Sequence, residues 1–134
     1  MQIGLPIPNL QIALTSLPAL RRMETHAVLQ VPIAVLSMEG AIQQVNQWVA
    51  TGSRAHTVTF VNAHMAVEAQ LRPEFRNSLR QMDLNCPDGA PIYWLARRAS
   101  NSRAGKISGP EFMPQFCAQS VALGHRHFLY GGVE

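Results

Sequence analysis

The sequence predicts an open α/β fold, in which helices flank a parallel β-sheet. Short apolar runs rich in β-branched residues alternate with segments whose apolar residues recur every three or four positions, the spacing of a helix face. The connections between these segments are short, and alternation of this kind favours parallel strands joined by helical crossovers.

Composition indicates one globular domain of ordinary size. The chain has 134 residues, of which 47% are hydrophobic and 14% charged, so it can bury a core without disulfide or metal staples. The formal net charge is +3, and Lys106 is the only lysine among the basic residues. An arginine excess suits phosphate or carboxylate partners, and a solvated surface is the alternative explanation. The basic residues are scattered and lack interleaved aromatic residues, so nucleic-acid binding is not predicted.

The patterns of cysteine, histidine and hydropathy further narrow the class of protein to which the sequence can belong. Cys86 and Cys117 lie far apart without a CxxC motif, which favours buried thiols of a reducing compartment over a disulfide. The five histidines form no HExxH or comparable pattern, so no metal site is predicted. No apolar run reaches the roughly 18 to 20 residues of a spanning helix. Contact with a membrane surface is still compatible with the sequence.

Residues 1–30 are predicted to be a poorly ordered extension that precedes the domain at 31–134. The stretch is mildly apolar and carries Pro6, Pro8 and Pro18. Arg21 and Arg22 follow the apolar part, whereas a secretory signal has its positive charge first. Met23 is therefore an alternative translation start to Met1.

The first half of the domain contains two apolar runs and three helical segments. "VPIAVLS" leads to Ser37, a helix N-cap, and Gly52 ends the helix that follows. "HTVTFVN" is too short for a helix, so 57–61 is predicted to be a strand buried on both faces. A helix begins near Ala63, and Pro73 opens its second segment.

The second half of the domain repeats the alternation of strands and helices. Residues 83–86 form a predicted strand, "PDGAP" is its exit loop, and Pro91 lies in the first turn of the next helix. After a polar loop, Pro110 begins another helix, which Gly124 ends. "HFLYGG" at 127–132 is predicted to be a last apolar strand with two terminal glycines.

Ligands of open α/β sheets bind at the carboxyl ends of the strands. Three strand exits are predicted, at Asn62, at Asp88 and at the pair Gly131 and Gly132. Asn62 offers a donor and an acceptor, Asp88 offers a carboxylate, and the glycines allow a phosphate to approach backbone N–H groups. Asn and Asp-Gly are also common turn formers. The residues alone leave both interpretations of each exit open.

Four blocks, in order and spacing, resemble the WecG/TagA/CpsF family of bacterial glycosyltransferases. They are "VPIAVLSMEGAI", "VTFVNAHMAVEAQLRPEFRNSLRQMDLNCPDGAPIYWLARR", "KISGPEFM" and "HFLYGG". The resemblance covers about Val31 to Gly132, and its most specific element is the order strand, Asn, helix, strand, PDG. It implies a Rossmann-like fold. Because relatives continue well beyond the Gly-Gly strand, the chain is expected to hold an incomplete, N-terminal half of that fold.

The resemblance implies an inverting transferase that moves a sugar from a UDP-linked donor to an acceptor sugar on a polyprenyl diphosphate. Such enzymes act in exopolysaccharide or teichoic acid synthesis, so a cytoplasmic location is expected, with peripheral association at the inner face of the plasma membrane. Asp88 matches the family's proposed general base, which accepts the proton of the attacking hydroxyl. No metal and no cofactor are implied.

The remaining site residues are also implied by the resemblance. They are Asn62 and Thr59 for the acceptor, Lys106 and Gly109 for a diphosphate, and Gly131 and Gly132 for the nucleotide. Two positions depart from the family pattern. Phe60 stands where many relatives have a threonine, and Lys106 replaces a frequent arginine, which keeps the charge but loses the bidentate fork.

Two hypotheses about function follow. The first is a truncated or split transferase whose sheet is completed by a second polypeptide or by a homo-oligomer. The second is a non-catalytic remnant or interaction module of the same fold. Both share one expectation, that the final strand leaves an exposed edge with an uncovered apolar face.

Overall fold

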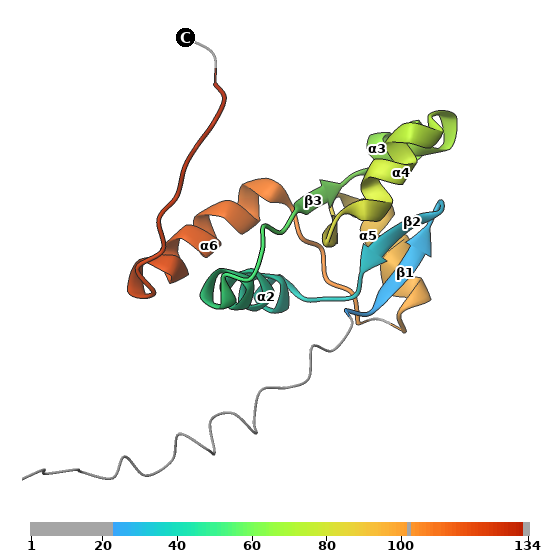
Figure 1. Cartoon of the computed structure of the whole chain (residues 1–134). Coiled ribbons are helices and arrows are strands. Elements are labelled where there is room, and N and C mark those ends of the chain that lie inside the picture. Colours follow the sequence, from blue (N-terminus) through green and yellow to red (C-terminus); the bar gives the residue numbers. More distant parts are fainter. Residues whose placement is uncertain (1–22, 102, 133–134) are drawn as a thin grey trace, which may run out of the picture.

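The computed structural model describes residues 23–101 and 103–132 (Figure 1). In chain order the elements are β1 (Thr25–Val28), β2 (Val31–Ala34), α2 (Met38–Thr51), β3 (Val58–Val61), α3 (Ala63–Leu71), α4 (Pro73–Gln81), β4 (Leu84–Pro87), α5 (Ala90–Ala99) and α6 (Gly109–Ala122). Strands and helices alternate, so the predicted α/β class is confirmed.

The described part of the chain contains two small sheets. β1 and β2 form an antiparallel hairpin, and β3 pairs with β4 in parallel, from Val58 opposite Leu84 to Val61 opposite Pro87. β2 also contacts β4, where the Asn85 side-chain amide donates to the Pro32 carbonyl at 3.0 Å. Pro32 has no N–H, which limits the backbone ladder that β2 can form. One parallel pair is therefore present, and the continuous open sheet of the prediction is not.

The strand β1 corrects the expectation that residues 1–30 form an extension. Residues 1–22 lie outside the described part of the chain, but Thr25–Val28 is paired and Val28 is only 5% exposed. Leu29 and Gln30 both have positive φ, 47° and 64°, as a two-residue type I′ hairpin turn requires. The Arg80 Nε donates to the Gln30 carbonyl at 3.1 Å, and the Gln70 amide donates to the Leu29 carbonyl. These bonds hold the turn against α3 and α4.

Two apolar clusters lie on opposite faces of the β3–β4 pair. Val61 packs with residues of α3, α4 and α5, among them Ala66, Leu79 and Ile92. Leu84 and Cys86 pack with residues of α2 and α6. Figure 1 shows the same division, with α2 beside α6 and the other three helices on the opposite side. The pair thus has helices on both faces, as parallel strands require.

The predicted helix boundaries agree with the structure. The Ser37 Oγ accepts from the Gly40 N–H at 3.1 Å and caps α2, which ends at Gly52 with φ 57°. Pro73 opens α4, and prolines also lie in the first turns of α5 and α6. The strands shift slightly: β3 begins at Val58, and only Val61 in it is fully buried, so the prediction of a strand buried on both faces is only partly right.

The predicted strand at 127–132 is wrong. No strand is assigned there, and Phe128, Leu129 and Tyr130 are 88%, 81% and 96% exposed. Figure 1 shows this segment leaving the body of the molecule beyond α6. A strand needs a neighbour to bond its N–H and C=O groups, and the segment has no paired neighbour among the described residues.

Candidate functional site

Asn62 and Asp88 lie side by side at the carboxyl edge of the parallel pair. Val61 is opposite Pro87 in the ladder, so Asn62 and Asp88 are the next residues of the two strands. The Asp88 N–H donates to the Val61 carbonyl at 3.0 Å, which extends the pairing by one more bond. The structure therefore brings together the two side chains that the sequence placed at separate strand exits.

Asn62 is the N-cap of α3. Its backbone is extended, with φ −100° and ψ 176°, and its Oδ1 accepts from the Met65 N–H at 3.0 Å. The side chain is exposed, and within the described residues its Nδ2 group makes no hydrogen bond. Asn62 therefore has a structural role as the cap of α3. This role uses only its side-chain oxygen, so the amide N–H groups are available to a ligand.

Asp88 begins the turn that leads into α5. Gly89 follows with φ 77° and ψ 158°, a conformation that favours glycine. Asp88 is half-buried, and no hydrogen bond or ion pair reaches its carboxylate from the residues that the structure describes. Burial and, next, the Asp88 charge raise the pKa of the neighbouring Cys86 thiol to about 12. The carboxylate is thus an unpaired acceptor next to Asn62.

The loop 105–109 runs along the same edge. The Ile107 N–H donates to the Pro87 carbonyl at 2.9 Å, and the Gly105 N–H donates to the Leu36 carbonyl at 2.7 Å. These bonds fix the loop between the ends of β2 and β4, and Lys106 lies between them. The Lys106 Nζ is 3.7 Å from the Glu111 Oε1, and both side chains are about half exposed. A cation therefore stands near the end of β4, partly balanced by Glu111.

Gly109 has a packing explanation. It begins α6, and a Cβ atom at this position would lie 3.3 Å from the Phe60 Cδ2. Phe60 and Phe112 pack with their ring centroids 5.3 Å apart, so the glycine lets α6 begin directly against β3. The close approach that the sequence suggested for a phosphate is made here to an aromatic ring.

Thr59 and the terminal glycines are not brought to this edge. Thr59 is half-buried within β3, three residues before Asn62 and so about 10 Å away along the strand. Gly131 and Gly132 have φ 111° and 115°, and no atom lies within 4 Å of where their Cβ atoms would stand. The structure thus brings Asn62, Asp88 and the loop with Lys106 to one edge. It packs Gly109 against Phe60 and leaves the other three predicted residues apart.

A feature that the site residues alone did not reveal is the convergence of helix N-termini. β2, β3 and β4 each lead into a helix, namely α2, α3 and α5, and α6 begins from the loop at the same edge. The N-terminus of a helix carries a partial positive charge and free N–H groups, which favour anions. The sequence signals for these starts were Ser37, Asn62, Pro91 and Pro110.

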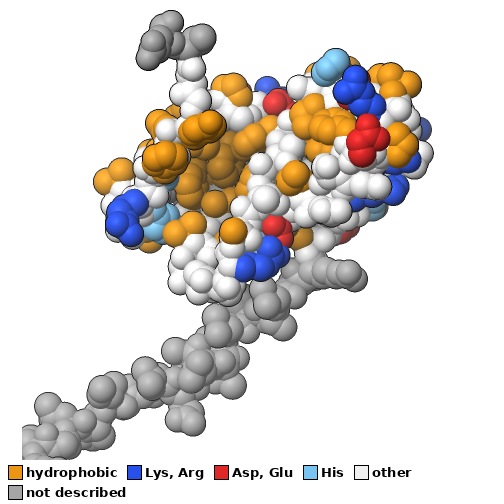
Figure 2. Space-filling view, turned by 45° about the horizontal axis from the view of Figure 1, so that its top comes forward, with side chains coloured by type: hydrophobic (Ala, Val, Ile, Leu, Met, Phe, Trp, Pro, Cys, Tyr) orange, Lys and Arg blue, Asp and Glu red, His pale blue; other side chains and the backbone are white. Residues whose placement is uncertain are grey.

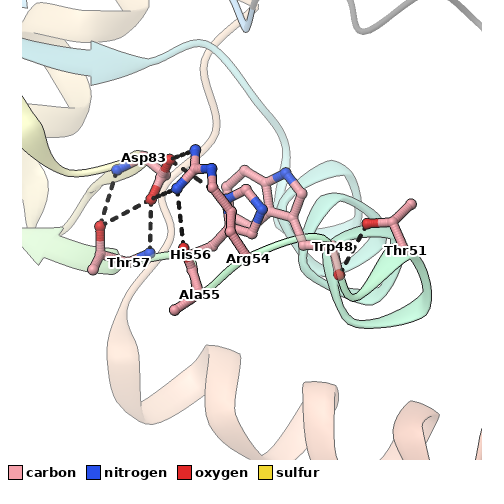
Figure 3. A network of polar contacts seen from close by, with 7 residues as sticks. All are labelled: Trp48, Thr51, Arg54, Ala55, His56, Thr57 and Asp83. Atoms are coloured by element: carbon pink, nitrogen blue, oxygen red, sulfur yellow. Dashed lines mark hydrogen bonds and ion pairs between the residues drawn. The ribbon is translucent and has the colours of Figure 1, made fainter.

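Sequence reasoning also missed a polar network at the opposite end of β4 (Figure 3). The Asp83 carboxylate accepts from the Thr57 N–H at 2.9 Å and from the Thr57 hydroxyl at 3.1 Å, and it pairs with the Arg54 guanidinium. The Arg54 hydrogen bonds, followed by those from Thr57, hold the pKa of Asp83 well below its usual range. Nearby, the His56 ring stacks on Trp48 with centroids 4.2 Å apart. The network joins the amino ends of β3 and β4.

No group of three or more His, Cys, Asp or Glu side chains among the described residues is placed to hold a metal ion. No helix among them is long and apolar enough to cross a membrane.

Comparison with known proteins agrees with the resemblance of the four sequence blocks. The model of the glycosyl transferase WecG/TagA/CpsF family matches residues 26–134, which include the hairpin strand β2 and every element after it. No curated protein matches the chain. The family match covers more than half of the sequence, so the chain belongs to the WecG/TagA/CpsF family of glycosyl transferases.

Proposed function

We propose that this chain forms the acceptor side of an inverting glycosyltransferase. The donor is a UDP-sugar, and the acceptor is a sugar on a polyprenyl diphosphate, used in cell-surface polysaccharide or teichoic acid synthesis at the inner face of the plasma membrane. Membership of the family supports sugar transfer in general. The observation that carries the rest is the Asp88 carboxylate beside Asn62 at the carboxyl edge of β3 and β4, which no group of residues 23–101 and 103–132 binds.

The proposed step is a single displacement. The acceptor hydroxyl oxygen attacks the anomeric carbon of the donor sugar while Asp88 takes the hydroxyl proton, and the bond from that carbon to the UDP oxygen breaks. Attack opposite the leaving group inverts the anomeric centre, so no covalent enzyme intermediate forms. The free Asn62 Nδ2 group orients the acceptor sugar by donating to one of its hydroxyl oxygens.

Positive potential at the same edge supports the diphosphate part of the proposal. Lys106 supplies a point charge beside the end of β4. The N-termini of α2, α3, α5 and α6 add partial positive charge. Gly131 and Gly132 contribute to the nucleotide site only if their segment moves towards the sheet, because they are exposed and uncontacted in the structure.

A specific observation also favours the second candidate, a non-catalytic module of the same fold. The segment 127–132, which carries the predicted nucleotide glycines, lies outside the sheet. In this form the edge that carries Asn62 and Asp88 is formed, whereas Gly131 and Gly132 do not lie against it. A module of this kind binds the lipid-linked sugar without transferring anything to it.

The two aspartates of the sequence allow a controlled test, since Asp83 and Asp88 flank opposite ends of β4. Transfer from UDP-sugars to a lipid-diphosphate acceptor analogue is measured for the wild type, Asp88→Asn and Asp83→Asn. We expect Asp88→Asn to lose about 10²- to 10⁴-fold in turnover, and Asp83→Asn to keep its turnover per folded molecule. Equal turnover by wild type and Asp88→Asn would remove Asp88 from the mechanism. Acceptor binding without turnover in any of the three would support the module.

A further inference from the structure

β3 has an open outer edge. Its inner side pairs with β4, and within residues 23–101 and 103–132 no backbone group bonds to Val58–Val61 from the other side. At the amino end of β3, where the loop from α2 enters the strand, lies an apolar hollow of ≈ 270 Å³, whose lining includes Val45, Trp48 and Val49 of α2 and Val58 of β3. Figure 2 shows hydrophobic surface gathered in a hollow on the side from which the C-terminal segment leaves. An open edge with an apolar hollow is a template for another strand.

The same chain carries a segment of matching chemistry. Residues 127–130 read HFLY, and the side chains of Phe128, Leu129 and Tyr130 are almost fully exposed. The segment is held at its start, where the His127 Nε2 is 2.7 Å from the Ser120 Oγ and the His127 ring packs edge-on against Phe116. Beyond His127 it projects away from the body (Figure 1). This apolar segment with aromatic residues is therefore anchored at one end, and it pairs with no strand in the part of the chain that the structure describes.

We propose that residues 127–132 of one copy add as a strand to the outer edge of β3 in a second copy, and that reciprocal exchange produces a dimer. Each copy has one segment to donate and one edge to accept it, so a twofold arrangement satisfies both sites at once. Main-chain hydrogen bonds supply affinity, and side chains on both faces of the strand supply fit. The proposal does not depend on the proposed transfer reaction.

The second copy is favoured as the donor because the segment leaves its own β3 in the structure. Apolar residues on both faces of a strand, here Phe128 and Tyr130 on one and Leu129 on the other, match a sheet with helices on both sides. An aromatic side chain buries about 150–250 Å². The four rings of two exchanged segments therefore supply a large part of the roughly 1,200 Å² at which specific interfaces begin.

The test uses the full chain and three variants chosen at exposed positions, so that folding is preserved. Leu129→Pro removes a backbone N–H from the donated segment. Val49→Glu places a charge at the lining of the accepting hollow, where Val49 is 49% exposed. Leu71→Glu on α3 is the matched control, because Leu71 is 74% exposed and does not line the hollow.

Molar mass is measured by light scattering over a wide range of concentrations. We expect the wild type and Leu71→Glu to be dimers, and Leu129→Pro and Val49→Glu each to be monomers. A mixture of Leu129→Pro with Val49→Glu retains one intact edge and one intact segment, so we expect it to form a mixed dimer. A wild type that stays monomeric at all concentrations would overturn the proposal, and so would a dimer that survives in Leu129→Pro.

Discussion

The backbone N–H of Asp88 donates to the carbonyl oxygen of Val61 at 3.0 Å. This bond extends the β3–β4 pairing beyond Pro87 and fixes where the turn into α5 begins. Asp88 is therefore positioned by its backbone, and its carboxylate bonds to no group among the described residues. Substitution of the Asp88 side chain therefore tests its chemical role without removing the backbone bond that positions it.

The first prediction concerns Asp88→Asn. Because the carboxylate makes no structural bond in the described chain, we expect the free energy of unfolding to stay within about 0.5 kcal/mol of the wild type. Urea denaturation of both proteins at neutral pH measures this directly. A loss of several kcal/mol would mean that the carboxylate supports the PDG turn, and any loss of transfer by this variant would then have a structural cause.

The second prediction separates the two roles of Asn62. Asn62→Ala removes the side-chain acceptor that caps α3, and we expect it to cost about 1 kcal/mol of stability. Asn62→Ser keeps a capping oxygen but lacks the amide donor, so we expect near-wild-type stability with weaker binding of the acceptor. Denaturation curves and acceptor KM values are compared for both variants. Wild-type KM in Asn62→Ser would leave the residue with its capping role alone.

Local signals made much of this site predictable from the sequence. Ser37, Asn62 and Pro73 mark helix starts because a cap or a first-turn proline acts on neighbouring residues. The meeting of Asn62 with Asp88 followed from a general property of parallel strands, whose carboxyl ends share one edge.

The failures involve contacts that no local pattern encodes. β1 was missed because its turn uses Leu29 and Gln30 at positive φ, where the recognisable signal is Asn-Gly or Asp-Gly. Asp83 joins Arg54 and Thr57 across 29 and 26 residues of sequence. The segment 127–132 has the composition of a strand, but strand formation depends on a neighbour. Its composition alone therefore could not show whether a neighbouring strand would be available to it.

The third prediction concerns acid stability. The pKa of Asp83 is depressed in the folded state by Arg54 and Thr57, so its contribution is present above the unfolded value of about 3.9 and is lost as pH falls towards the folded value. We expect Asp83→Asn to cost about 1–2 kcal/mol at pH 7, a figure reduced by partial exposure. The difference should shrink steadily below about pH 4.

Arg54→Met is the control for this acid effect. It removes the guanidinium and leaves both bonds from Thr57 to the Asp83 carboxylate in place, so we expect a smaller loss of stability at neutral pH than with Asp83→Asn. Urea denaturation across the acid range measures both variants. A difference between wild type and Asp83→Asn that grows on acidification would contradict the direction of the pKa shift.

The fourth prediction tests whether Gly109 serves packing. Gly109→Ala places a Cβ 3.3 Å from the Phe60 ring, and we expect it to destabilise the fold by about 1 kcal/mol, the lower end of overpacking costs. The control is Gly40→Ala within α2, where the nearest atom would be the Ser37 Oγ at 3.4 Å. There the higher helix propensity of alanine should stabilise by up to about 1 kcal/mol. Opposite signs in thermal unfolding are expected, and a stabilised Gly109→Ala would contradict the packing explanation.

The fifth prediction concerns the two thiols. Cys86 is fully buried and its pKa is raised to about 12, first by burial and then by the Asp88 charge, whereas Cys117 is half-buried on α6. Only the thiolate reacts with alkylating reagents, so native protein at pH 8 should lose one thiol quickly and the other only through unfolding. In denaturant the two should react alike. Because burial is the larger cause, Asp88→Asn should leave Cys86 protected, and rapid labelling of Cys86 in that variant would show that the charge, not the packing, suppresses its reactivity.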